Sequence, residues 1–161
     1  MYVLAAVLVI GLLTWLFADL LQQQRNPNQS PGGSVDPAGN ITLMLQRNRE
    51  GHYVASGQVN GADVEFLLDT GATAVAVPAE LAKKLDLAPG RPVKTVTANG
   101  IATAYLTKID ELRLGEIVER DIVATLVPNL PGGQILLGMS FLKRLDFSQR
   151  GDTLLLESQN Q

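Results

Sequence analysis

Residues 66–77 read FLLDTGATAVAV and carry the strongest structural signal in the chain. They place Asp69-Thr70-Gly71 between two runs of apolar and small residues, which are typical of buried strands. One interpretation is an ordinary turn, in which Asp69 hydrogen-bonds its own backbone and Gly71 supplies unusual dihedral angles. The other is a functional loop, because exposed turns seldom lie between continuous apolar runs and a carboxyl group in such a place is typical of active sites. We favour the functional loop.

The composition excludes several classes of chemistry. The chain has 161 residues, which suffice for one domain of roughly 100–130 residues with a single core. It has no Cys, so disulfides, thiol nucleophiles and thiolate metal clusters are excluded, and its single histidine, His52, cannot build a multi-histidine zinc site. We therefore expect no metal and no cofactor. The formal charge of -3, without basic clusters, gives no electrostatic reason to expect a nucleic-acid partner.

The N-terminal residues predict a membrane helix. Residues 1–18 carry no charge, and a helix of that length covers roughly 27 Å, close to the thickness of a hydrocarbon core. We predict a transmembrane anchor over residues 1–21, rather than a buried core helix or a cleaved signal peptide, because no Lys or Arg precedes Arg25. Residues 22–40 are rich in Gln, Asn, Pro, Gly and Ser and predict a flexible linker. The soluble domain is then 41–157, followed by a tail at 158–161.

The domain itself reads as mostly β. Three dipeptides, Asn60-Gly61, Asn99-Gly100 and Gly115-Glu116, separate short β-rich runs and predict hairpins. Two short helices are expected at 78–87 and 139–145, and a last strand at 153–156. These patterns predict a closed, barrel-like sheet with two short helices.

These motifs resemble those of the retroviral-type (retropepsin-like) aspartic proteases over most of residues 41–157. The resemblance rests on Leu67-Leu68-Asp69-Thr70-Gly71-Ala72, on the hairpin around Asn99-Gly100, and on Ile135-Leu136-Leu137-Gly138 followed by a short helix. More narrowly, the chain is similar to bacterial members that carry one N-terminal transmembrane helix. One position departs from the pattern: retroviral enzymes commonly have Arg after the later glycine, whereas this chain has Met139. How a dimer is held is therefore left open.

The resemblance implies a mechanism. Two Asp carboxyls about 3 Å apart cannot both ionise, so they share a proton and together activate a water. Because the chain has one such motif, the second Asp69 must come from another copy, giving a homodimer. Thr70 would position the carboxyls and Gly71 would allow close backbone approach. Asn99 and Gly100 would form a flap over an extended peptide; the alternative for this hairpin is an ordinary edge hairpin.

The sequence thus predicts a membrane-anchored aspartic endopeptidase that cleaves extended protein or peptide segments. The alternative is a peptide-binding or scaffolding module that keeps the fold but does not turn over substrate. The intact Asp69-Thr70-Gly71 favours the enzyme, because a binding module has no need of a carboxylate in an apolar loop. We expect a single-pass protein of a bacterial inner membrane with its domain in the periplasm; the sequence leaves the cytoplasmic side open.

Overall fold

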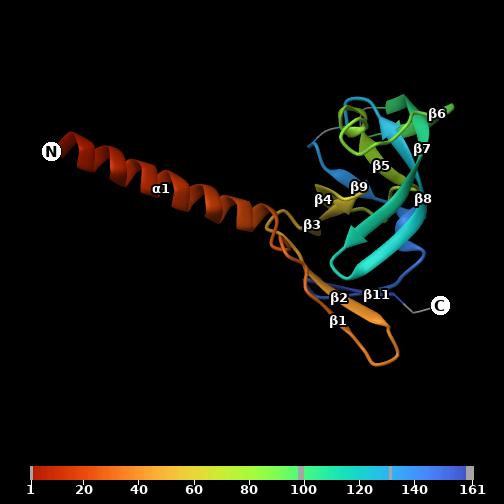
Figure 1. The fold of residues 1–161 in the computed structure, drawn as a ribbon, viewed down its shortest axis with the longest axis horizontal. Helices are drawn as coiled ribbons and strands as arrows, with labels where there is room; N and C mark the ends of the chain where they lie inside the picture. Colours follow the sequence, from red (N-terminus) through yellow and green to blue (C-terminus); the bar gives the residue numbers. More distant parts are fainter. Residues whose placement is uncertain (1, 98–99, 131, 159–161) are drawn as a thin grey trace.

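The structure is a computed structural model that describes residues 2–97, 100–130 and 132–158. A long helix, α1 (Tyr2–Arg25), projects away from a β domain that contains the rest of the chain (Figure 1). Two sheets make up this domain. It is mostly β, as the sequence predicts.

The larger sheet closes into a barrel. Among the described residues its hydrogen-bonded order is β3-β4-β9-β5-β8-β7-β6. An additional pairing of β3 with β7 closes six of these strands into a ring, and β6 pairs with β7 outside it. Fully buried side chains from several strands fill the interior, among them Phe66, Ile109 and Ile135. The strands are β3 (Val54–Val59), β4 (Ala62–Leu68), β5 (Val75–Pro78), β6 (Pro92–Thr97), β7 (Gly100–Leu114), β8 (Ile117–Val127) and β9 (Ile135–Leu137).

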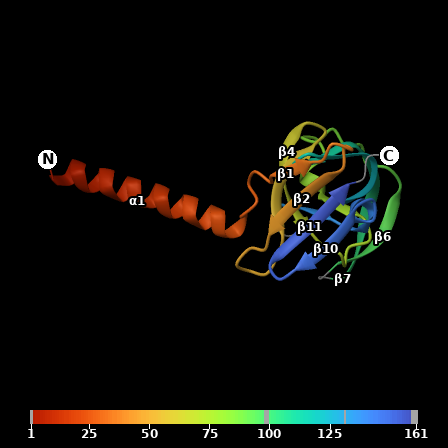
Figure 2. The same ribbon diagram turned by 90° about the horizontal axis from the view of Figure 1, so that it is seen from below.

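The smaller sheet covers one side of the barrel (Figure 2). Its order is β1-β2-β11-β10, all antiparallel, with β1 (Gly33–Val35), β2 (Ile41–Gln46), β10 (Asp146–Arg150) and β11 (Thr153–Ser158). Leu43 and Leu45 of β2 and Leu156 of β11 are buried, whereas Met44 between them is exposed. This period of two gives the sheet one face toward the core and one toward solvent.

Two predicted hairpins are confirmed. Asn60 and Gly61 have φ of 49° and 79° between β3 and β4, as the two-residue hairpin turn requires. Asn60 also fastens the turn to the rest of the barrel, because its Nδ2 donates to the Leu85 carbonyl and its Oδ1 accepts from the Glu111 N–H. Gly115, with φ of 57°, turns β7 into β8.

The predicted helices are shorter than expected. The segment 78–87 forms only the 3-10 turn η1 (Ala79–Leu81), followed by further turns. Leu85 and Leu87 are both buried, and Asp86 between them has φ of 53°. Residues two apart cannot share one face of an α-helix, so burying both requires an irregular path. The second helix, α2, is Met139–Leu142 rather than 139–145.

The segment 22–40 differs from the flexible tether that its composition predicts. Helix α1 continues to Arg25, and Asn26 and Asn28 are buried against the barrel. Asn28 forms a parallel bridge to Ala55, and its side chain donates to the Val54 and Gln46 carbonyls and accepts from the Gln46 N–H. The segment has few apolar groups, but the Asn28 side-chain amide hydrogen-bonds backbone groups of β2 and β3 that do not pair with each other.

Helix α1 is long and apolar enough to cross a membrane, by length and composition. The window Ala6–Arg25 has 20 residues and a mean hydropathy of 1.6, and none of it is buried in the domain. The absence of burial argues against the core-helix interpretation. Helix α1 also ends four residues beyond the predicted anchor, at Arg25.

Candidate active site

The backbone of Asp69 is fixed by two neighbouring strands. Strand β4 ends at Leu68, whose N–H donates to the Tyr53 carbonyl at 3.0 Å. The next N–H, that of Asp69, donates to the Leu137 carbonyl at the end of β9 at 3.1 Å. Because β4 and β9 run parallel, with Leu68 opposite Leu137, the loop that follows β4 emerges beside the end of β9. The parallel pairing of β4 with β9 therefore sets where Asp69 lies.

The loop also orients the carboxylate. Asp69 Oδ1 accepts a hydrogen bond from the Gly71 N–H at 2.8 Å, and the Asp69 carbonyl accepts one from the Ala72 N–H at 3.2 Å. A Cβ at Gly71 would lie 3.1 Å from Asp69 Oδ1, so glycine leaves this contact unstrained. Asp69 is partly exposed, and Thr70 and Gly71 are exposed. This is the geometry of an Asx turn, so the local hydrogen bonds alone fit either interpretation of the motif.

The start of α2 packs directly on the loop and distinguishes it from an isolated turn. The Met139 N–H donates to the Ala72 carbonyl at 2.8 Å, and the Ser140 N–H donates to the Thr73 carbonyl at 3.1 Å. A Cβ at Gly138 would lie 2.3 Å from the Ala74 carbonyl oxygen and 2.6 Å from that of Ala72. The Ile135–Gly138 motif and the Asp69 loop, 64 or more residues apart in the chain, thus form one unit.

Ser140 has a structural part in this unit that sequence reasoning missed. Its hydroxyl accepts from the Val75 N–H at 2.9 Å and donates to the Val123 carbonyl at 2.8 Å. It therefore joins α2 to β5 and β8. A serine at the second position of a short helix has no distinctive sequence signal for this role.

Arg144 secures the other end of the α2 segment. Its guanidinium donates to the Arg120 and Asp121 carbonyls of β8 at 2.6 and 2.9 Å, and Asp121 has φ of 56°. Lys108 on β7 hydrogen-bonds the Asp121 carboxylate, which lowers the pKa of Asp121 and raises the pKa of Lys108. This exposed ion pair joins β8 to β7, which is one strand of the predicted flap hairpin.

The predicted flap residues are only partly described. Strands β6 and β7 form the expected hairpin, and Gly100 pairs with Thr97 with φ of 105°. Asn99 lies outside the described residues. Ile101 next to the turn is 74% exposed. Among the described residues, the hydrogen bonds that fix Asp69 and Gly71 come from β9 and from the loop itself.

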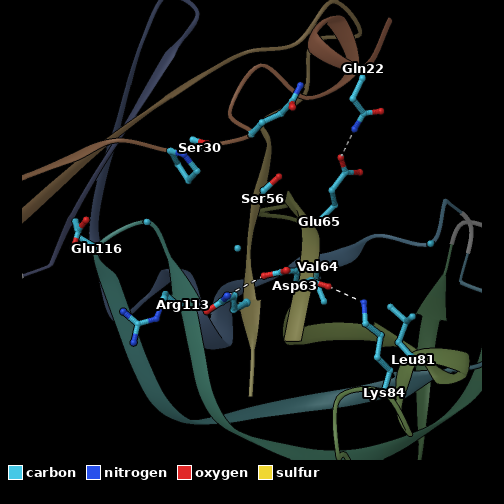
Figure 3. Close-up of a pocket in the computed structure, with 16 residues that line it drawn as sticks. Gln22, Ser30, Ser56, Asp63, Val64, Glu65, Leu81, Lys84, Arg113 and Glu116 are labelled. Atoms are coloured by element: carbon cyan, nitrogen blue, oxygen red, sulfur yellow. Dashed lines mark hydrogen bonds between the residues drawn. The ribbon is translucent and has the colours of Figure 1, made fainter. Parts of the chain in front are cut away.

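A large hollow lies elsewhere on the molecule (Figure 3). It has a volume of about 890 Å³ and is lined by polar residues from the end of α1, β3, β4 and β7, including Gln22, Glu65 and Arg113. Asp69, Thr70 and Gly71 do not line it.

Comparison with known proteins identifies the family. The family model described as gag-polyprotein putative aspartyl protease matches residues 55–144, more than half of the chain. The chain belongs to this retropepsin-like aspartic protease family. The matched residues run from β3 through α2, and therefore include the Asp69 loop, the β6–β7 hairpin and Gly138. Helix α1 and the smaller sheet lie outside the match.

Individual relatives are bacterial. An uncharacterised protein from the cobV 5' region of Sinorhizobium sp. is 38% identical over 76% of this chain and 54% of its own length. An uncharacterised protein of Rickettsia prowazekii (strain Madrid E) is 31% identical over 63% of this chain and 45% of its own length. The chain thus spans about half the length of these curated relatives.

A solved structure agrees with the family assignment. The crystal structure of a retropepsin-like aspartic protease from Rickettsia conorii matches with a TM-score of 0.63 and 29% identity, over 78% of this chain and 95% of that one. The retropepsin-like fold predicted from Asp69-Thr70-Gly71 and Gly138 is therefore confirmed.

Proposed function

We propose that this chain is a membrane-anchored aspartic endopeptidase that hydrolyses peptide bonds in extended protein segments. The observation that carries the proposal is the intact Asp69-Thr70-Gly71 loop, held by β9 and α2, in a chain of the retropepsin-like aspartic protease family. Partial burial of the Asp69 carboxylate next to apolar strands costs free energy, and a binding module would not need this carboxylate.

The proposed catalytic unit is a pair of Asp69 carboxyls from two copies of the chain. One carboxyl, ionised, takes a proton from the attacking water, while the other, protonated, donates to the oxygen of the scissile carbonyl. The chain contains one Asp-Thr-Gly, and Thr70 and Gly71 are exposed where a second loop would approach. Thr70 would then position the two carboxyls, and the hairpin with Asn99 and Gly100 would close over the substrate backbone.

Helix α1 supplies the proposed anchor. Its apolar window is 20 residues long, and none of it is buried in the domain. We place the protein in a bacterial inner membrane with the domain in the periplasm. A mature protein that begins at Met1 and stays with the membrane after alkaline extraction is the expected result; a soluble protein lacking α1 would show a cleaved signal sequence instead.

The test of the activity uses the full chain purified in detergent and an unfolded protein such as casein at pH values from 3 to 7. Wild type should cleave casein best at mildly acidic pH, because activity requires the proton shared by the two carboxyls. Asp69→Asn should abolish cleavage without unfolding the domain. Asp110→Asn, which removes an exposed carboxylate on β7, should cleave like wild type.

Two outcomes would contradict the proposal. Cleavage by Asp69→Asn at the wild-type rate would mean that another group activates the water. A wild-type protein that binds an extended peptide without cleaving it would identify the binding module instead.

A further inference from the structure

Glu65 collects hydrogen bonds from two separate parts of the chain. It lies on β4, four residues before Asp69, and its side chain is 23% exposed. Oε1 accepts from Gln22 Nε2 at 3.2 Å and from Asn26 Nδ2 at 3.1 Å, while Oε2 accepts from Gln134 Nε2 at 3.1 Å. Figure 3 shows the Gln22 side chain reaching Glu65 across one end of the hollow.

One group of these donors belongs to the end of the apolar helix. Gln22 is on the last turns of α1, and Asn26 follows its last residue, Arg25, whose guanidinium lies 3.9 Å from Glu65 Oε2. Asn26 is fully buried, and its Nδ2 also donates to Ser56 Oγ. Hydrogen bonds to an ionised carboxylate are the stronger ones, and a buried amide that loses its acceptor pays the full cost of desolvation.

The other donor belongs to the second strand of the active-site unit. Gln134 immediately precedes β9, whose residue Leu137 accepts the hydrogen bond from the Asp69 N–H. Glu65 on β4 and Gln134 before β9 therefore join the two parallel strands at one end, and the Asp69 loop leaves them at the other. Strand β9 pairs over only three residues, Ile135–Leu137, and the hydrogen bond from Gln134 to Glu65 adds a link to β4 at its start.

We propose that Glu65 is a positioning residue for Asp69, and that it couples the end of the α1 helix to the β4–β9 pair that carries the active-site loop. The proposal rests on the proposed protease function. It means that residues 22–28 belong to the catalytic domain, so that the membrane helix is attached to the active-site strands by direct contact.

The experiment compares Glu65→Gln with Glu116→Gln in the full chain in detergent. Glutamine keeps the size of the side chain but removes one acceptor oxygen, so it cannot serve both donor groups. Glu116 lines the same hollow and is exposed, which makes it a matched control. We expect Glu65→Gln to lower kcat at least about threefold with KM little changed, since misplaced catalytic groups cost rate. Glu116→Gln should retain wild-type kcat.

Hydrogen exchange supplies a readout that does not depend on activity. In Glu65→Gln, amides in 66–73 and 135–142 should exchange faster, while those of β7 and β8 stay as slow as in wild type. Uniform acceleration throughout the domain would mean that Glu65 contributes only global stability, and would overturn the proposal. Equal behaviour of Glu65→Gln and Glu116→Gln would overturn it as well.

Milder variants keep the test decisive if Glu65→Gln does not fold. Gln134→Ala removes the hydrogen bond that joins Glu65 to the start of β9, and Gln22→Ala removes one of the contacts that join Glu65 to the end of α1. If Glu65 couples α1 to β9, both variants should accelerate amide hydrogen exchange in residues 135–142. If it does not, neither variant should. Failure of the protease function itself would be recognised separately, by an Asp69→Asn variant that still cleaves casein.

Discussion

Gly138 shows how a single residue holds the active-site unit together. It lies where β9 ends and α2 begins, and the carbonyl groups of Ala72 and Ala74 approach it so closely that no side chain fits. The adjoining N–H of Met139 donates to one of these carbonyls. The close approach of the two backbones is thus the reason for glycine at this position, since its φ of -87° needs no glycine.

Gly138→Ala is therefore expected to disrupt the site. The added Cβ would have to displace the Ala74 carbonyl from 2.3 Å, which moves the backbone that follows Asp69. Overpacking of this kind costs about 1–3 kcal/mol. Thermal unfolding of the full chain should show a lower Tm, and casein cleavage should fall further than stability alone explains. Gly32→Ala is the control, because a Cβ there meets nothing within 4 Å; equal Tm values for the two variants would contradict the argument.

Some single residues had roles that the sequence could predict, and others did not. Asp69 and Gly138 stand next to apolar runs that mark buried strands, so their importance follows from local pattern. Glu65, Asn26 and Asn28 carry no such pattern. Their roles depend on which segments meet in space. In a Gln- and Asn-rich segment, the local sequence does not distinguish a buried polar residue from a solvated one.

At the scale of elements, hairpins were predictable and helices less so. The turns at Asn60-Gly61 and Gly115 require positive φ, and Asn and Gly are the residues that adopt it most readily, so the local sequence predicts these hairpins. The segment 78–87 has helix-forming residues, but tertiary packing draws both Leu85 and Leu87 into the core and leaves a single 3-10 turn. The strand β10 has five exposed residues and no apolar alternation, so nothing in its own sequence announces it.

The segment that joins helix and barrel gives a prediction at this scale. A fragment that starts at Ile41 lacks Asn28, which satisfies backbone groups of Val54 and Gln46, and it lacks strand β1. Each buried backbone group left without a partner costs about 1–3 kcal/mol. The fragment 41–161 should therefore unfold at lower urea concentration than the fragment 22–161.

Circular dichroism during urea titration measures both midpoints. Asn28→Ala in the longer fragment removes only the side-chain amide. It should lower the urea midpoint of fragment 22–161 by a large share of the difference between the two fragments. Coincident unfolding of the two fragments would show that residues 22–40 are a tether after all.

The whole molecule combines a closed barrel with the partly exposed Asp69 loop of the proposed active site. The barrel closes through the pairing of β3 with β7, so its strand pairing is complete within one chain. The chemistry is not, because one carboxylate supplies half of the proposed acid–base pair. Folding and activity are therefore expected to depend differently on concentration.

Activity should require dimers even where folding does not. Dilution of the detergent-solubilised full chain should lower its specific activity while circular dichroism stays unchanged, as dimers dissociate into folded half-sites. In a membrane, α1 would raise the effective concentration of subunits, so an interface with Met139 in place of Arg can be weak in detergent and sufficient in the bilayer.

Mixing subunits tests the shared site most directly. With a threefold excess of Asp69→Asn, random pairing leaves about one-sixteenth of the dimers with both carboxylates, so activity should fall well below the one-quarter expected from independent subunits. Asp110→Asn in the same excess is the control and should add activity of its own. If the Asp69→Asn subunit does not interfere, and specific activity is constant down to a demonstrated monomer, the second acid lies within the same chain and the two-copy site is wrong.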